Sequence, residues 1–179
     1  DVKSAFDRWR EAPGVVGFHL EGPFISPHFP GAQPQQYIAS LPPSSDWTSV
    51  LEDPMLKIVT LAPEIPGGLE LTKWLSDRGV RVSIGHTNAT CEECRQAVGA
   101  GAKQMTHVYN AMRPLHHREA GCVGFALLNE GLQHCELIYD RVHVGLDAAR
   151  LMLAARGALG VIGISDGTAA AGLPPGTCL

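Results

Sequence analysis

The chain has little of what marks a protein that binds polyanions or enters a membrane. Its net charge is -4, its basic residues form no run, and only 6% of its residues are aromatic, so we expect no surface for nucleic acid or acidic lipid. No apolar stretch reaches the roughly 20 residues that cross a bilayer, and the first ten residues lack the apolar centre of a signal peptide. We therefore expect no nucleic-acid partner, no membrane association and a cytoplasmic location.

Cysteine is also scarce, with five residues in 179. An odd count in a chain of this size does not suit a disulfide framework, so we expect reduced thiols. Cys91 and Cys94 do form a C-x-x-C pair, but they follow Thr90, which makes a capping box with Glu93 at the start of a predicted helix. We interpret them as ordinary helix residues and not as a metal or redox site.

What the chain does have is a series of short apolar runs along its whole length. Their nearly continuous hydrophobicity is typical of strands that are covered on both faces, which favours a parallel sheet. Each run enters a Gly-containing or polar segment. The six predicted strands are residues 15–21, 56–61, 81–85, 104–108, 136–139 and 160–165.

Helical patterns alternate with these runs. Residues 71–78 precede Gly79, residues 90–98 precede Gly99, and residues 148–156 follow Asp147 as an expected cap and precede Gly157. Residues 26–53 are instead a long loop with short helical stretches at 35–40 and 47–51, and a loop of this kind is suited to substrate contact. The alternation predicts an α/β fold, either an open doubly wound sheet or a barrel.

Ionisable groups fall where the predicted strands end. If the strands are parallel, these groups meet at one carboxyl-terminal edge, and burying them there without partners would cost several kcal/mol each. The groups are Glu21, His86, His107, the pair Asp140 and His143, and Asp166. Each has an ordinary structural explanation when taken alone, but their coincidence indicates a shared site.

Two histidines and one glutamate form a zinc ligand set that leaves a position open for water, whose pKa the metal lowers to about 7. The histidines and Glu21 at the strand ends therefore predict a divalent metal site. Asp166 then remains as a general base.

Five sequence blocks around these residues resemble the N-acetylglucosamine-6-phosphate deacetylase family of the amidohydrolase superfamily. They occur in the family's order and spacing and cover nearly the whole chain. They are HLEGPF at 19–24 with Gly31 and Ala32 following, GHTNAT at 85–90, THVYNAM at 106–112, HREAG at 117–121 and SDGT at 165–168.

The resemblance implies a (β/α)8 TIM barrel of the metal-dependent amidohydrolase type. Glu21, His86 and His107 would bind the divalent metal, with zinc expected first and iron, cobalt or manganese as alternatives, and Asp166 would be the catalytic acid/base. The reaction would be hydrolysis of the N-acetyl group of a phosphorylated amino sugar, with acetate as a product.

The same resemblance implies the substrate contacts and the assembly. Ala32, Asn110 and Ala111 would contact the sugar phosphate, Arg118 would grip the phosphate, and His143 would touch the substrate, in a pocket that a second subunit of a homodimer completes. Gln33 stands where the family usually has a histidine. A glutamine donates a hydrogen bond but cannot become cationic, so its contribution there must differ.

The extent of the resemblance implies that residues 1–179 form a partial barrel domain. Only about six of the eight parallel strands are expected, with the first two strands, the last helix and a small β domain missing, since six strands do not close such a barrel. The alternatives are a related amidohydrolase, such as an N-acetylgalactosamine-6-phosphate deacetylase or a cyclic-amide hydrolase, and a truncated, non-catalytic fragment.

Overall fold

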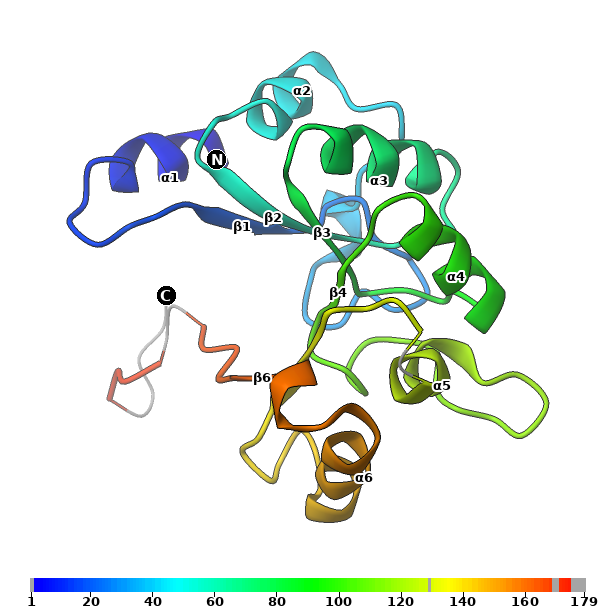
Figure 1. Cartoon of the computed structure of the whole chain (residues 1–179). Coiled ribbons are helices and arrows are strands. Elements are labelled where there is room, and N and C mark those ends of the chain that lie inside the picture. Colours follow the sequence, from blue (N-terminus) through cyan, green and yellow to red (C-terminus); the bar gives the residue numbers. More distant parts are fainter. Residues whose placement is uncertain (1, 129, 169–170, 175–179) are drawn as a thin grey trace.

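The computed structural model describes residues 2–128, 130–168 and 171–174. Its six strands form one parallel sheet in which each strand pairs with the next along the chain (Figure 1). The strands are β1 (Phe18–Glu21), β2 (Leu56–Leu61), β3 (Arg81–Ile84), β4 (Gln104–Met105), β5 (His134–Ile138) and β6 (Val161–Ile164). All six predicted strands are confirmed. Strand β4 has only two residues, because the backbone leaves the extended conformation before His107, whose φ is positive.

Helices alternate with the strands and follow one another around the outside of the curved sheet (Figure 1). They are α1 (Val2–Trp9), α2 (Ser45–Leu51), α3 (Gly68–Asp77), α4 (Cys91–Gly99), α5 (Gly121–Leu128) and α6 (Leu146–Arg156), with 3-10 turns at Gln35–Tyr37 and Ala158–Gly160. The predicted capping box at Thr90 and Glu93 is present in both directions. The α/β alternation predicted from the sequence is therefore confirmed.

Two helix predictions need correction. Asp147 does not cap α6: the N-cap is Gly145, and Asp147 lies inside the first turn, where its charge suits the positive end of the helix dipole. Helix α5 was not predicted because its residues are apolar on every side. Residues 121–126 are all buried in it, so no polar face exists to reveal a helical period.

The hydrophobic core lies between the sheet and these helices. Branched side chains of the strands pack there against apolar side chains of α3, α4 and α5, as expected for strands covered by crossover helices. Fully buried examples are Val59, Leu61, Val82, Ile84, Leu75, Cys94 and Phe125. This packing holds the carboxyl ends of the strands at one edge of the sheet.

The described strands form a half-barrel and not a closed barrel. Strands β1 and β6 stand at the two ends of the strand order and have no partner on their outer sides among the described residues. Apolar side chains are exposed close to both ends, with Val16 85% exposed before β1 and Leu159 94% exposed before β6. None of the described helices is both long enough and apolar enough to cross a membrane.

Gly85 leaves room for a close approach between β2, β3 and β4, directly before His86. A Cβ at this position would lie 2.7 Å from Thr60 Cγ2 and 2.9 Å from Thr106 Cβ, and both neighbours are buried. We expect Gly85→Ala to lower the free energy of unfolding by about 1–3 kcal/mol through overpacking. Urea titration followed by circular dichroism measures the change.

Gly99→Ala is the matched control, since the same added Cβ meets nothing within 4 Å at the end of α4. This variant should be at least as stable as the unchanged chain. Equal stability of the two variants would contradict the close packing at Gly85.

Candidate metal centre

Three side chains that are far apart in the sequence converge at the carboxyl edge of the sheet. Glu21 Oε1 lies 2.7 Å from His86 Nε2 and 3.3 Å from His107 Nε2, and the two Nε2 atoms are 3.1 Å apart. The two imidazoles are 5% and 3% exposed, and the carboxylate is 31% exposed. One carboxylate oxygen and two imidazole nitrogens therefore face a common point from β1 and from the ends of β3 and β4.

The donor set suits a divalent cation. His86 Nδ1 lies 3.1 Å from the carbonyl oxygen of Phe29, which can only accept, so Nδ1 carries the hydrogen and neutral His86 points the lone pair of Nε2 at Glu21. A lone pair facing a carboxylate is repulsive unless a proton or a cation lies between them. Two imidazoles and one carboxylate are also a ligand set that zinc uses when it keeps a position open. Glu21, His86 and His107 thus form a candidate metal site.

The charges within the trio affect one another strongly. The adjoining imidazoles of His107 and His86 hold the pKa of Glu21 well below its ordinary range, although partial burial opposes this. Burial by itself lowers the pKa of His107, but the hydrogen bond and charge of Glu21, together with the charge of Asp166, raise it above its ordinary value. Glu21 is therefore a carboxylate in this site, which is the form that ligates a cation.

The backbone at these positions is unusual. His86, His107 and Asp166 all have positive φ, at 48°, 28° and 49°, in the left-handed region that residues other than glycine rarely adopt. Each residue stands just beyond the end of its strand. Strained conformations of this kind cost about 1–3 kcal/mol each and persist where the surroundings enforce them, as at functional sites.

A polar layer, buried except for His19, lies beneath the trio. Thr60 Oγ1 is 2.7 Å from both His19 Nε2 and Thr106 Oγ1, and Ser83 Oγ is 2.6 Å from Thr106 Oγ1. These contacts join β1, β2, β3 and the end of β4. Since buried hydroxyl groups are costly without partners, the chain of hydrogen bonds keeps the strand ends in register below the ligands.

Glu136 on β5 supports the backbone of His107. Its Oε1 accepts from Gln104 Nε2 at 2.6 Å, and its Oε2 lies 3.4 Å from the backbone nitrogen of His107. The carboxylate acts on the backbone and not on the ring, since His107 Nδ1 is buried and has no hydrogen-bond partner among the described residues.

Asp166 lies beyond the end of β6 and is exposed. It is not part of the trio, but its charge contributes to raising the pKa of His107. Asp166 is therefore a carboxylate close enough to the candidate ligands to affect His107, but it is not one of them.

Some of the other residues predicted to bind substrate lie next to the trio. Gln33 Nε2 donates to the carbonyl oxygen of Glu21 at 3.3 Å, and Ala32 is exposed beside it. Asn110 Nδ2 donates to the carbonyl oxygen of His107 at 3.3 Å. Ala111 has φ of 45° and accepts a hydrogen bond from the Thr87 amide, so it lies in the loop that follows His107.

Gly31 explains how the long loop approaches His86. Its φ is 58°, and a Cβ there would stand 2.8 Å from His86 Cε1. The absence of a side chain lets the loop that carries Ala32 and Gln33 lie directly over the imidazole.

Arg118 and His143 are exposed and make no hydrogen bond to the trio among the described residues. Arg118 lies on a short hairpin whose backbone is closed by His116 and Glu119. His143 Nδ1 is 2.6 Å from Asp140 Oδ2, and this bond, together with two backbone amides, lowers the pKa of Asp140 to about 2. The pairing leaves Nε2 of His143 available to a ligand.

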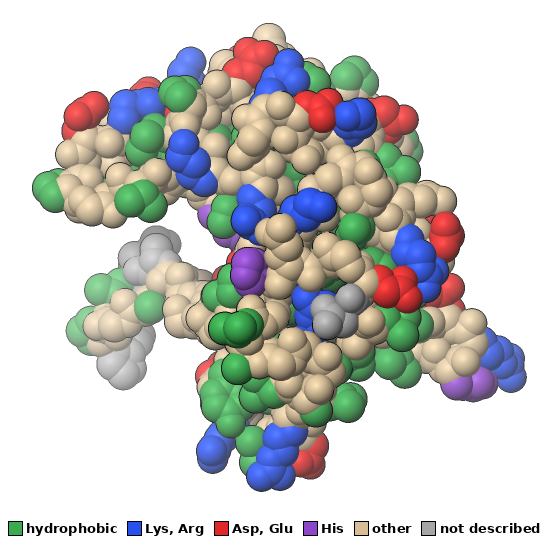
Figure 2. Space-filling model, viewed as in Figure 1, with side chains coloured by type: hydrophobic (Ala, Val, Ile, Leu, Met, Phe, Trp, Pro, Cys, Tyr) green, Lys and Arg blue, Asp and Glu red, His purple; other side chains and the backbone are tan. Residues whose placement is uncertain are grey.

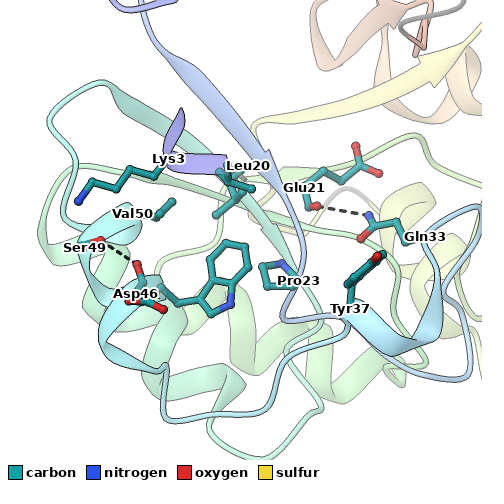
Figure 3. Close-up of a pocket in the computed structure, with 11 residues that line it drawn as sticks. Lys3, Leu20, Glu21, Pro23, Gln33, Tyr37, Asp46, Ser49 and Val50 are labelled. Carbon is teal, nitrogen blue, oxygen red and sulfur yellow. Dashed lines mark hydrogen bonds between the residues drawn. The ribbon is translucent and has the colours of Figure 1, made fainter. Parts of the chain in front are cut away.

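A cavity of about 790 Å³ adjoins Glu21 on the outer side of β1. Glu21, Gln33 and Tyr37 lie on one side of it, and side chains of α2 lie on the other (Figure 3). Of the residues predicted to bind substrate, only Gln33 lines this cavity. The cavity thus reaches one ligand of the trio from the free edge of the sheet.

Sequence reasoning missed Glu64. It lies three residues beyond β2, and its carboxylate binds the segment that follows His86. The signal was present, because the rule that selected ionisable groups at the other strand ends applies to Leu61-Ala62-Pro63-Glu64 as well.

The four cysteines that the structure describes lie away from this edge. Cys91, Cys94, Cys122 and Cys135 are buried and free, and the Sγ atoms of Cys94 and Cys122 are 3.8 Å apart between α4 and α5. The hydrogen bond to the Cys122 thiol, together with burial, raises the pKa of Cys94, which favours an inert thiol. The C-x-x-C pair therefore belongs to the helix, as predicted.

Comparisons with known proteins agree on one enzyme class. No protein-family model matches the chain. It is 44% identical over 164 residues to the N-acetylglucosamine-6-phosphate deacetylase of Lysinibacillus sphaericus, covering 90% of this chain and 42% of the relative. It is 38% identical over 170 residues to an Escherichia coli N-acetylgalactosamine-6-phosphate deacetylase, covering 93% of this chain and 45% of the relative.

The fold matches the same class of enzyme. The crystal structure of a variant of the Mycobacterium smegmatis N-acetylglucosamine-6-phosphate deacetylase, in complex with N-acetylglucosamine-6-phosphate, aligns with a TM-score of 0.88 at 32% identity. The alignment covers 97% of this chain and 45% of that structure. The chain therefore spans less than half the length of the proteins that it matches.

Proposed function

We propose that this chain, a homologue of the N-acetylglucosamine-6-phosphate deacetylases, carries the metal centre and the acid/base of such an enzyme within a longer polypeptide. The observation that carries the proposal is the convergence of Glu21, His86 and His107. The reaction is hydrolysis of the N-acetyl group of N-acetylglucosamine 6-phosphate to acetate and glucosamine 6-phosphate. The remainder of the barrel, with the first two strands, the last helix and a small β domain, would come from the rest of that polypeptide.

The ligand set favours zinc, with iron, cobalt or manganese as alternatives. When bound, the ion would lower the pKa of a water molecule and polarise the amide carbonyl of the substrate. His86 is preset for this role, because Phe29 holds its Nδ1 hydrogen and leaves Nε2 to ligate. Glu21 brings the negative charge that balances part of the charge of the ion.

Asp166 would move the proton. Its carboxylate takes one proton from the attacking water as the new C–O bond forms at the acetyl carbon. It then gives that proton to the amide nitrogen as the C–N bond breaks, so that a neutral amine and acetic acid leave. The acid then loses its remaining proton to solvent and becomes acetate. The exposed position of Asp166 beyond β6, outside the trio, suits a group that must carry and release a proton.

The sugar phosphate would be held by residues on the loops around the trio. Ala32, Asn110, Ala111 and His143 would contact the substrate, and Gln33 would donate a hydrogen bond from its place beside Glu21. Arg118 would bind the phosphate, since its planar fork can bond two oxygens at once. Because Arg118 projects on an exposed hairpin, a homodimer in which a second subunit completes the pocket is part of the proposal.

A cytoplasmic location also belongs to the proposal. The substrate is a phosphorylated metabolite, and the four cysteines described by the structure are free thiols, as is usual in a reducing compartment.

The deciding experiment is an acetate-release assay on the protein that carries this chain, with metal analysis of the same sample. We expect one bound divalent ion and turnover of N-acetylglucosamine 6-phosphate. N-acetylgalactosamine 6-phosphate is the second substrate to assay, since a relative at 38% identity carries that name. Preference for the galacto sugar or for a cyclic amide would replace the proposed substrate, and bound metal without turnover of any of them would indicate a non-catalytic fragment.

Arg118→Ala tests the phosphate contact. We expect the preference for phosphorylated over unphosphorylated N-acetylglucosamine, measured as a ratio of kcat/KM values, to fall about ten- to a hundredfold, because a charge-assisted bond to phosphate is lost. Arg78→Ala is the control, since that guanidinium stacks on Trp74 on the outer side of α3. An unchanged ratio in Arg118→Ala would remove the arginine from the phosphate site.

A further inference from the structure

Glu64 binds the segment that directly follows His86. Its Oε2 accepts a hydrogen bond from Thr87 Oγ1 at 2.6 Å, and its Oε1 accepts one from the backbone nitrogen of Asn88, also at 2.6 Å. Both bonds are short for their type, and they use the two oxygens of one carboxylate. Glu64 thus connects the loop after β2 to the loop after β3.

The segment held in this way is strained. His86 has φ of 48°, which a residue with a Cβ adopts only where the surroundings enforce it. The residues that follow His86 determine the direction in which the chain leaves β3, and therefore where the imidazole points. A clamp on Thr87 and Asn88 acts at the place where this strain must be held.

The same segment also carries the loop that follows His107. The Thr87 amide donates to the carbonyl oxygen of Ala111, the Arg113 amide donates to the carbonyl oxygen of Thr87, and Arg113 Nε donates to the carbonyl oxygen of Asn88 at 2.7 Å. By fixing Thr87 and Asn88, Glu64 also fixes the support of the second loop. Both histidines of the trio are thereby connected to one carboxylate that touches neither ring.

We propose that Glu64 is a positioning residue of the metal centre, which acts through Thr87 and Asn88 to hold His86 at ligating geometry. This inference rests on the proposed function, since it takes the trio to be a metal site. Glu64 lies outside the trio, three residues beyond β2. Its hydrogen bonds to Thr87 and Asn88 make it a second support of His86, in addition to the Phe29 carbonyl.

Titration of the metal-free chain with Co²⁺ tests the proposal, because visible absorption of bound Co²⁺ reports both its affinity and its coordination geometry. Loss of an outer partner of a ligating histidine typically weakens metal binding about ten- to a hundredfold. We expect a loss in this range for Glu64→Ala and a smaller one for Glu64→Gln, whose amide group keeps one acceptor oxygen. Both variants should also change the absorption spectrum.

Glu119→Gln is the matched control. Glu119, like Glu64, accepts two hydrogen bonds through its carboxylate, here from the backbone amides of Cys91 and Gly121 at 2.8 and 2.9 Å. It binds the start of α4 and of α5 and not the segment after His86. Its loss should lower thermal stability to a similar degree and leave Co²⁺ affinity and spectrum unchanged. If Glu64→Gln and Glu119→Gln behave alike, Glu64 is a stabilising residue only and the proposal is wrong.

A measurement without metal separates this proposal from the metal centre itself. Ring resonances of His86 in NMR spectra of the metal-free chain should shift in Glu64→Gln and stay in place in Glu119→Gln. If the unchanged chain binds no Co²⁺, the metal centre is wrong, and shifted His86 resonances still support the positioning of the ring by Glu64. Unshifted resonances in both variants overturn the proposal whatever the metal result.

Discussion

Replacing Asp166 by asparagine should lower acetate release about 10²- to 10⁴-fold, the range that a positioned general acid/base contributes, while the bound metal stays at the level of the unchanged protein. Asparagine has nearly the same shape but neither takes up nor releases a proton. Because Asp166 lies outside the trio, its replacement removes no ligand. The measurement is an acetate-release assay with metal analysis of the same sample.

Asp147→Asn is the control for this change. Asp147 is also an exposed carboxylate beyond the ends of the strands, but it lies in the first turn of α6 and contacts only Arg150, at 3.6 Å, among the ion pairs that the structure describes. The turnover of Asp147→Asn should match that of the unchanged protein. Near-normal turnover in Asp166→Asn would show that another group moves the proton.

Removal of the His86 imidazole should have the largest effect on metal content. His86→Ala deletes one of three donors and leaves Glu21 facing a cavity, so we expect metal affinity to fall by more than about a hundredfold, beyond the range seen for outer partners of a ligand. The His86→Ala variant should retain almost no metal after dialysis. Elemental analysis after dialysis against a weak chelator measures this.

His117→Ala provides the comparison, because His117 is exposed on the hairpin that carries Arg118. It should keep its metal. The unchanged protein and His117→Ala should also melt at higher temperature when Zn²⁺ is added, since a ligand that binds only the folded state stabilises it. One metal ion per chain in His86→Ala would mean that the ion binds elsewhere.

The local features of the fold could be predicted from sequence because their causes are local. The capping box of Thr90 and Glu93 involves residues three apart, and the strand around Val59 is recognisable because a mostly apolar run suits a strand covered on both faces. Helix α5 could not be predicted in this way. Its burial on every side removes the polar face that a periodic pattern needs.

The convergence of the three candidate ligands could be predicted as well, but its supports could not. The rule that parallel strands bring their carboxyl ends to one edge brought Glu21, His86 and His107 together without knowledge of any distance. The same rule was not applied to Glu64, which lies beyond a Pro in the loop after β2. The hydrogen-bonded layer of Thr60, Thr106 and Ser83 also left no signal, since buried threonines and serines in strands are not distinctive in a sequence.

The sequence by itself determined which residues are able to ligate, to carry a proton and to form a parallel sheet, because residue chemistry and strand period are properties of the chain. Only the tertiary structure decided that Glu21 Oε1 and two Nε2 atoms meet within 3.3 Å, which tautomer His86 adopts and which carboxylate holds its loop. The reason is physical. These properties depend on contacts between residues that are separated by between 21 and 86 positions in the chain, and such contacts exist only once the strands have packed in register.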